Sequence, residues 1–161
     1  MMQLDLFPIQ PNSCIFTGHR DLGEDFSVQE LKQAIQDLLN SGVRIFYNGF
    51  AVGFDTEAVK ALLSFKKKYP DIKLIACIPC PEQDKYFNFK QKREYKRLVK
   101  KADEQILVSD YYFNGCMLKR NRYMAERADV MIAYCKEKTG GTAYTVNYFK
   151  KVNPGAEIIF L

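Results

Sequence analysis

The sequence lacks the features of a membrane-spanning or exported protein. Its 161 residues contain no apolar run of about 18 residues, the length that a helix needs to cross a bilayer. The first thirteen residues, MMQLDLFPIQPNS, have no cationic region followed by an apolar stretch, so they do not resemble a secretion signal. We therefore predict a cytoplasmic protein without a membrane partner.

Histidine is scarce, and the cysteines are not spaced for a metal site. The chain has one histidine and five cysteines, an odd number that favours reduced thiols. Cys77 and Cys80 have C-x-x-C spacing, but Cys77 ends an apolar segment and prolines flank Cys80. A zinc site would also need two more ligands, and no second pair is present. We predict no metal and no cofactor.

Positive charge is in small excess and is concentrated in one segment. The net charge is +5, and seven of the twelve residues in KQKREYKRLVKK, residues 90–101, are Lys or Arg. Tyr95, Leu98, Val99 and Ala102 recur at helical spacing, which predicts an amphipathic helix with a basic outer face. Such a face is either a solvated surface or a stripe that follows the phosphates of a nucleic acid, and charge alone does not decide between them.

Strand and helix patterns alternate along the whole chain. Strands are predicted near residues 14–17, 44–47, 72–78, 105–108, 130–134 and 157–161. Helices are predicted between them, near residues 28–41, 55–68, 90–101, 117–127 and 143–151. This order predicts a Rossmann-like, doubly wound and mainly parallel α/β sheet of about six strands, with helices on both faces. We expect one domain over residues 13–161 after a tail of residues 1–12, with ligands at the carboxyl ends of the strands.

Two loops after predicted strands suit an anion. The first, FTGHRD, brings Thr17, Gly18, His19 and Arg20 to a strand end, where an arginine beside a glycine turn fits a negative group. The second, NGFAVGFD, contains Gly49 and Gly53 and ends at Asp55. Its glycines either let a phosphate approach the following helix or only permit positive φ, while Asp55 caps the helix, binds a ribose hydroxyl, or does both.

The last two candidate segments lie later in the chain. In KRNRYMAERADVMIAY, Asn121 is in phase with the apolar residues Met117, Met124 and Ala128, so we expect a buried Asn121. A surface Arg120 and Arg122 would flank it near the helix start. The segment TGGTAYT places Gly140, Gly141 and Thr142 at a predicted helix start, which suits a phosphate. No G-x-G-x-x-G fingerprint is present.

These segments, in this order, resemble one known group of proteins. FTGHR, NGFAVGFD, IPCPEQDKYF, KRNRYMAERADVMIAY and GGTAYT are similar to the motifs of the YpsA-like branch of the SLOG superfamily, to which DprA and the Lonely Guy hydrolases also belong. The resemblance implies a Rossmann-like fold, a bacterial or phage source and a pocket for a nucleotide or nucleotide-derived ligand. It implies no particular reaction.

The better-characterised relatives imply two other functions. Lonely Guy enzymes cleave nucleoside 5′-monophosphates with an arginine, which corresponds to Arg120, and a glutamate, whose position is Thr145 here. Threonine cannot replace that carboxylate, so hydrolysis would require Glu57 or Glu126 instead. DprA-like proteins share G-x-A-x-G-x-D (Gly49, Ala51, Gly53 and Asp55) and the R-N-R triplet, and bind single-stranded DNA. We expect this chain to bind a nucleotide or nucleotide-derived ligand in a sensing, regulatory or sequestering role, either as a single chain or as a homodimer.

The expected binding roles follow from these motifs. The first loop would contact phosphate or base, Asp55 would hold a ribose, Arg120 would neutralise a phosphate, and Asn121 would fix the ligand or the loops. The residues predicted to bind are Thr17, Gly18, His19, Arg20, Gly49, Gly53, Asp55, Arg120, Asn121, Arg122, Gly140, Gly141 and Thr142.

The tail carries a separate hypothesis. The segment Gln3, Leu4, Asp5, Leu6 and Phe7 resembles the short peptides that dock on the bacterial DNA sliding clamp. Two prolines keep the segment out of a helix, and a free tail gains nothing from exposed apolar residues. The alternative is that the segment packs back onto the domain.

Overall fold

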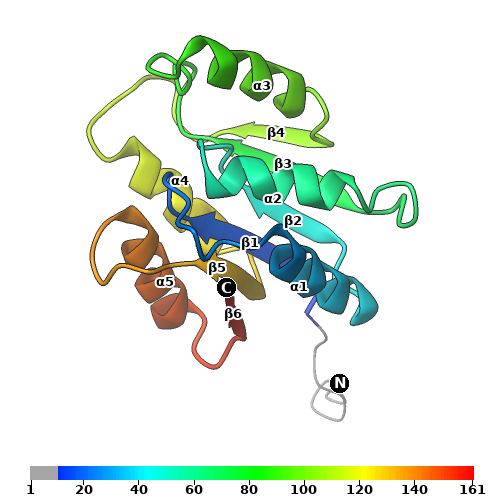
Figure 1. Cartoon of the computed structure of the whole chain (residues 1–161). Coiled ribbons are helices and arrows are strands. Elements are labelled where there is room, and N and C mark those ends of the chain that lie inside the picture. Colours follow the sequence, from blue (N-terminus) through cyan, green and yellow to red (C-terminus); the bar gives the residue numbers. More distant parts are fainter. Residues whose placement is uncertain (1–10) are drawn as a thin grey trace, which may run out of the picture.

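The computed structural model describes residues 11–161, and strands and helices alternate throughout this part of the chain (Figure 1). The strands are β1 (Ser13–Gly18), β2 (Ile45–Asn48), β3 (Lys73–Ile78), β4 (Glu104–Leu107), β5 (Val130–Tyr134) and β6 (Ile158–Phe160). The helices are α1 (Val28–Asn40), α2 (Phe54–Leu63), α3 (Phe89–Val99), α4 (Cys116–Ala125) and α5 (Gly141–Val152). The segment from Gln3 to Phe7 lies outside the described residues, so its docking on a clamp stays a prediction.

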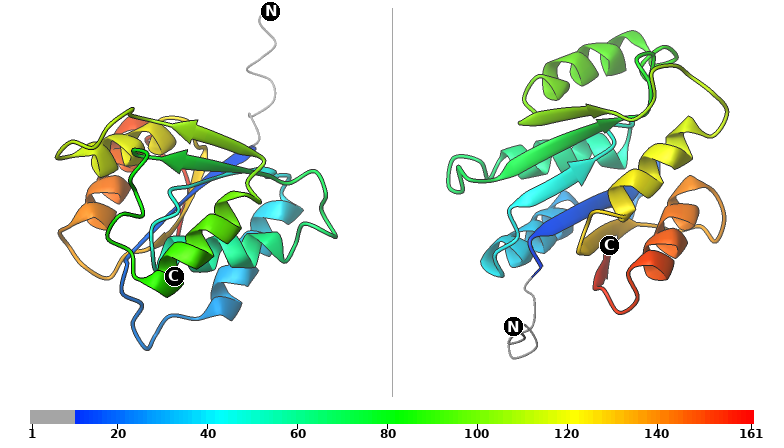
Figure 2. Two further views of the ribbon diagram at one scale, coloured as in Figure 1. Left: turned by 90° about the horizontal axis from the view of Figure 1, so that it is seen from above. Right: turned by 180° about the vertical axis from the view of Figure 1, so that it is seen from behind.

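The described strands form a six-stranded sheet in the order β4-β3-β2-β1-β5-β6, and every neighbouring pair is parallel. Figure 2 shows α1, α2 and α3 on one face of the sheet and α4 and α5 on the other. This arrangement confirms the predicted Rossmann-like fold with helices on both faces.

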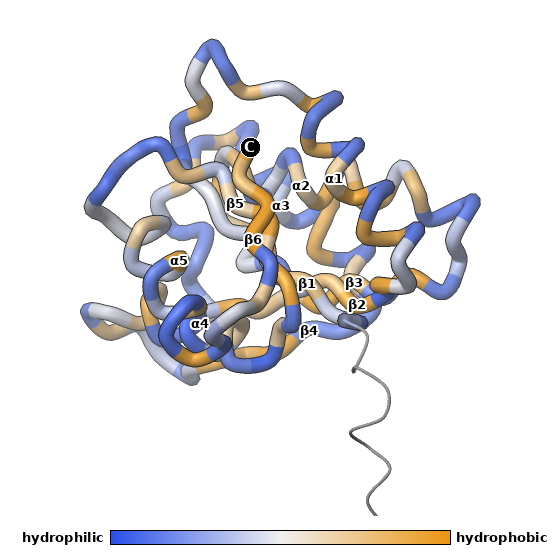
Figure 3. Tube along the Cα trace, turned by 90° about the horizontal axis from the view of Figure 1, so that it is seen from below, coloured by the Kyte–Doolittle hydropathy of each residue, from blue (hydrophilic) through white to orange (hydrophobic). Residues whose placement is uncertain are grey.

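Alternation along each strand divides the apolar core into two layers. Cys14 and Phe16 of β1 pack with residues of α1 and α2, whereas Ile15 packs with residues of α4 and α5. Figure 3 shows the resulting pattern, with apolar colour along the central strands and polar colour on the outer sides of the helices. A strand that is covered on both faces reads as a continuous apolar run, as β5 does with VMIAY.

The order of the strands places a crevice between β1 and β5. These two strands are paired along their length, from Cys14 with Val130 to Gly18 with Tyr134. The chain leaves β1 toward β2 on one side and leaves β5 toward β6 on the other, so the connections after β1 and β5 diverge. A parallel sheet binds ligands at such a switch point, outside the carboxyl ends of the strands.

Helix ends differ from the sequence prediction where capping differs. At α1, the N-cap Ser27 accepts the N–H of Glu30 at 3.2 Å, and the helix begins at residue 28 as predicted. At α2 the N-cap is Gly53, with φ of 84°, rather than Asp55, and the helix ends at Leu63 instead of continuing to residue 68. Within residues 11–161 no helix is long and apolar enough to cross a membrane.

Candidate functional site

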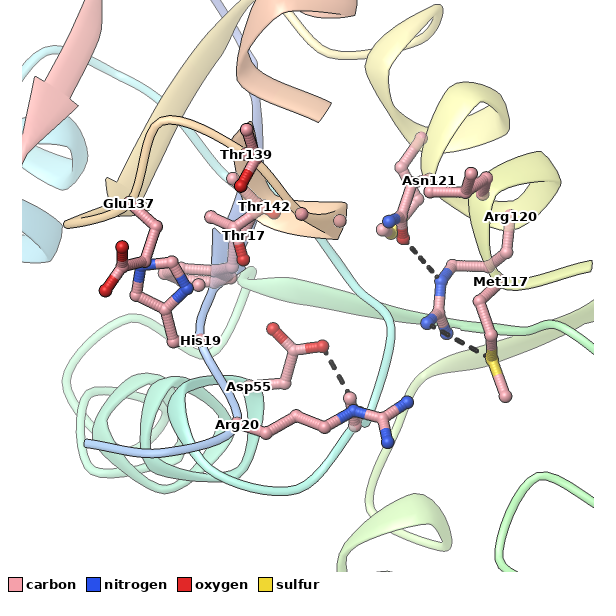
Figure 4. Close-up of a pocket in the computed structure, with 17 residues that line it drawn as sticks. Thr17, His19, Arg20, Asp55, Met117, Arg120, Asn121, Glu137, Thr139 and Thr142 are labelled. Carbon is pink, nitrogen blue, oxygen red and sulfur yellow. Dashed lines mark hydrogen bonds between the residues drawn. The ribbon is translucent and has the colours of Figure 1, made fainter. Parts of the chain in front are cut away.

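A cavity of about 270 Å³ opens at the carboxyl ends of β1 and β5 (Figure 4). We call it the central cavity. The loop after β1, the start of α2, one face of α4 and the loop before α5 form its walls. The described residues that line it are Phe16, Thr17, Gly18, His19, Arg20, Ala51, Asp55, Met117, Leu118, Arg120, Asn121, Met124, Glu137, Thr139, Gly140, Gly141 and Thr142.

The loop after β1 is fastened to the end of β5. His19 Nε2 accepts the backbone N–H of Lys136 at 2.7 Å. Tyr134 donates its hydroxyl to Asp25 at 2.8 Å and accepts the N–H of Gly23 at 2.9 Å. The predicted residues of this loop therefore line the cavity from a wall that these hydrogen bonds hold in place, and the exposed Arg20 adds a positive charge.

In the loop of residues 48–55, which we call the glycine loop, the two glycines lie against other atoms of the protein. A Cβ added to Gly49 would lie 2.6 Å from the guanidinium of Arg120, and one added to Gly53 would lie 2.1 Å from the backbone oxygen of Arg20. Neither glycine is among the described residues that line the central cavity. The structure thus gives both glycines a packing reason, while the predicted phosphate contact at this loop stays a prediction.

A buried asparagine that the sequence analysis missed shapes this loop. Asn48, at the end of β2, is 0% exposed. Its Oδ1 accepts the N–H of Phe50 at 2.7 Å, and its Nδ2 donates to the carbonyl of Asp55 at 3.1 Å. Phe50 has φ of 56°, an unusual conformation for a bulky residue, and Asn48 holds it there. Asn48 is the loop-organising asparagine that we expected at position 121.

Asp55 is a buried carboxylate in the wall of the central cavity. Its Oδ2 accepts the N–H of Ala51 at 3.2 Å, so the side chain closes the loop rather than capping α2 as one alternative predicted. Burial raises the pKa of Asp55 to about 6, although the positive charges of Arg120 and Arg20 oppose the shift. Figure 4 shows the carboxylate directed into the cavity, near His19 and Arg20.

Arg120 is buried, and the expectation of a surface arginine is wrong. Arg120 is 4% exposed, because it lies with Cys116 and Met124 on the inward face of α4. The guanidinium donates to the carbonyl oxygens of Gly49 at 2.6 Å and Cys77 at 3.0 Å. Arg120 thus joins α4 to the ends of β2 and β3 while still lining the cavity.

The neighbours of Arg120 are also placed differently from the prediction. Asn121 is half-buried, lines the cavity and accepts a hydrogen bond from Arg120 Nε at 2.8 Å. Arg122 is outside the set of described lining residues and donates to the Tyr144 hydroxyl at 3.1 Å, between α4 and α5. The prediction that Asn121 is buried was wrong, because the buried position is the preceding residue, Arg120.

The start of α5 faces the central cavity as an open cradle. The N-cap is Gly140, with φ of 98°, so no capping side chain accepts the N–H groups of the first turn. A Cβ at Gly140 or Gly141 would meet nothing within 4 Å, so space is free in front of this helix end. Helix N-termini favour anions because their first N–H groups point outward and carry partial positive charge.

Glu137, which the sequence analysis missed, gives the cavity a second carboxylate. It lies in the loop between the end of β5 and the glycine pair, and its place in that loop was the sequence signal that could have identified it as a cavity residue. The predicted substitutes for a catalytic glutamate lie elsewhere, since Glu57 pairs with Lys60 at 2.9 Å and Glu126 pairs with Tyr148. Thr145 is 0% exposed and donates to the carbonyl of Gly141 at 2.8 Å.

The thiols of the described residues are free and mostly buried. Cys77 and Cys80 are free and buried, and burial raises the pKa of the Cys77 thiol to about 12. Among residues 11–161, no three His, Cys, Asp or Glu side chains are grouped closely enough to hold a metal ion.

The parallel sheet and its helices on both faces define a Rossmann-like α/β protein, with the central cavity at the carboxyl edge of the sheet. Residues 14–158 match the sequence model of YpsA, described as the YspA SLOG family, and the chain therefore belongs to this family. The resemblance found in the sequence motifs is confirmed.

Two bacterial relatives and one solved structure illustrate this membership. The chain is 35% identical over 125 residues to the SPbeta prophage-derived protein YoqJ of Bacillus subtilis, covering 70% of this chain and 73% of YoqJ. It is 24% identical over 135 residues to the UPF0398 protein YpsA of B. subtilis, covering 80% and 75%. DNA processing protein A from Helicobacter pylori, solved for its single-stranded DNA binding mode, superposes with a TM-score of 0.67 at 19% identity. That match covers 94% of this chain and 65% of the other, and it shows the fold alone.

The positions of Arg120 and Asn121 predict an order of stability. Arg120→Ala removes the buried hydrogen bonds to the carbonyl oxygens of Gly49 and Cys77 and leaves Asp55 with Arg20 alone of its two positive neighbours, so we expect a loss of about 3 kcal/mol. Asn121→Ala removes one half-buried hydrogen bond and should cost about 1 kcal/mol. Urea unfolding of the ligand-free proteins measures both values, and a greater loss in Asn121→Ala would contradict the helix phase described above.

The glycines predict a second order. Gly53→Ala should destabilise the fold by about 3 kcal/mol, because its Cβ meets backbone and φ is 84°. Gly141→Ala should leave stability within about 0.5 kcal/mol of wild type, since its Cβ enters open space. Thermal unfolding without ligand compares them, and equal stability of the two variants would contradict the close packing of the glycine loop.

The burial of Asp55 predicts a pH dependence of stability. Its pKa rises from 3.8 to about 6 on folding, so the folded chain holds an extra proton between these pH values and is destabilised as pH rises through them. We expect Asp55→Asn to gain stability relative to wild type from pH 4 to pH 6.5, by on the order of 2–3 kcal/mol. The gain should level off above pH 7. Urea titrations at several pH values test this, and a constant difference across the range would contradict it.

Proposed function

We propose that this chain binds a nucleotide or nucleotide-derived ligand in the central cavity. The observation that carries the proposal is the convergence, at the switch point between β1 and β5, of an open helix N-terminus, an exposed arginine and two carboxylates. A nucleotide needs these groups together, because it has an anionic phosphate at one end and hydroxyl and amine donors at the other. The cavity volume of about 270 Å³ is near the lower end for small-molecule sites.

Each wall would meet a different part of such a ligand. The first N–H groups of α5, with Thr142, would hold the phosphate, and Arg20 would close over it from the opposite wall. Asp55 and Glu137 would accept hydrogen bonds from ribose hydroxyls or a base amine. Arg120 would act mainly through its charge and by holding the walls, because its NH1 and Nε atoms already donate to protein acceptors.

Single-stranded DNA binding is the second candidate function. DNA processing protein A from H. pylori binds single-stranded DNA, and the basic residues of α3 offer this chain a phosphate-binding face. The third candidate, hydrolysis of a nucleoside monophosphate, would have to use Asp55 or Glu137, the two carboxylates among the described lining residues.

The proposed function predicts weaker binding in two variants of the central cavity. Arg20→Ala should weaken the binding of AMP by about tenfold, because a charged partner of the phosphate is lost. Gly141→Val should abolish binding while the fold survives, because the added side chain fills the open cradle. Isothermal titration calorimetry measures both, with AMP first and then a nucleotide panel including NAD.

The matched control is Arg97→Ala, which removes the same charge from the exposed face of α3. Its affinity for AMP should equal that of wild type. An equal loss in Arg20→Ala and Arg97→Ala would contradict the central cavity and indicate general attraction to the basic face. An affinity for single strands that falls steeply with salt would favour the second candidate, and release of free base, detected by chromatography, would favour the third.

A further inference from the structure

A second hollow, of about 160 Å³, adjoins the central cavity. The described residues that line it are Glu82, Gln83, Lys85, Tyr86, Tyr112 and Met117. Met117 also lines the central cavity, so its side chain stands between the two spaces. The hollow is too small for a drug-sized ligand and suits a single flat ring system.

Two exposed tyrosines from separate loops make the walls of this hollow aromatic. Tyr86, in the β3–α3 loop, is 88% exposed, and Tyr112, in the β4–α4 loop, is 59% exposed. Rings this exposed contribute little to the core. The adjacent Tyr111 is also exposed, but it packs on Phe113, with ring centroids 5.8 Å apart, and lies outside this hollow.

The floor of the hollow is fixed to the wall of the central cavity. Gln83 is buried and its Nε2 donates to the carbonyl oxygen of Gly49 at 2.7 Å, the same oxygen that accepts from Arg120. The two spaces therefore share one hydrogen-bonded support. In the wall of the hollow, Lys85 Nζ lies 5.4 Å from the ring centroid of Tyr86, which adds a positive charge near the aromatic surface.

We propose that this hollow holds a second nucleobase, carried on the same ligand as the nucleotide in the central cavity. Aromatic walls stack on any base, and the adjacent lysine suits the phosphate that would join the two nucleosides. The inference rests on the proposed function and narrows the ligand to one with two bases, either a dinucleotide or a stretch of single strand.

The test compares AMP with the linear dinucleotide pApA, by calorimetry at one ionic strength. Wild type should bind pApA at least about fivefold more tightly than AMP, since stacking on an aromatic side chain favours each base. The double variant Tyr86→Ala, Tyr112→Ala should bind both probes with the affinity that wild type has for AMP. Because both rings are exposed, the variant should fold, which circular dichroism checks.

Tyr111→Ala is the matched control and should keep the preference for pApA. Equal affinities of wild type for AMP and pApA, or a preference that survives in the double variant, would overturn the second base site and leave the central cavity intact. If neither probe binds wild type, the proposed function and this inference both fail. A hexameric single strand of adenylate separates the two sources: tighter binding than pApA, lost at high salt, identifies a strand, and equal binding identifies a free dinucleotide.

Discussion

The buried guanidinium of Arg120 is the contact on which the arrangement of the site depends. It binds the carbonyl oxygens of Gly49 and Cys77, so a helix on one face of the sheet is tied to the ends of two strands. Burial lowers the pKa of Arg120, and the negative charge of Asp55 opposes that shift. Removing an arginine from water is costly unless carbonyl oxygens and a nearby carboxylate compensate, and this site supplies both. The absence of a side chain at Gly49 follows from the same contact, because a Cβ would occupy the position of the guanidinium.

The fold could be predicted from the sequence because its determinants are local. Apolar runs such as VMIAY and the glycines between elements each act within a few residues, and the rule that ligands bind at strand ends directed attention to the edge of the sheet where the central cavity lies. The phase of α4 could not be found in this way. Hydrophobicity favours an inward Asn121 over an inward Arg120, and the reverse is observed because the acceptors of Arg120 come from β2 and β3, far away in the chain.

The same limit explains the residues that the sequence analysis missed. Asn48 ends a strand as an ordinary polar residue, and its importance lies in the two backbone groups that the folded loop presents to it. Glu137 follows a lysine in an exposed, charged segment, and only the folded loop brings it to the cavity. Gly53 was recognised as a turn residue, but the backbone of Arg20 that excludes a side chain there belongs to another loop.

Asp55 connects the stability of the fold with the chemistry of the central cavity. Burial disfavours the ionised form of Asp55. Among the described residues, Ala51 donates one hydrogen bond to the carboxylate. A ligand hydroxyl that donated to the remaining acceptor positions would stabilise the ionised form, lower the pKa of Asp55 and release a proton on binding. Ligand binding in the cavity would then remove a destabilising charge from the wall of the site. A carboxylate whose ionised form is disfavoured by burial would therefore suit the proposed ligand if that ligand is rich in hydroxyl groups, and the N-terminus of α5 would hold the other end of the same molecule.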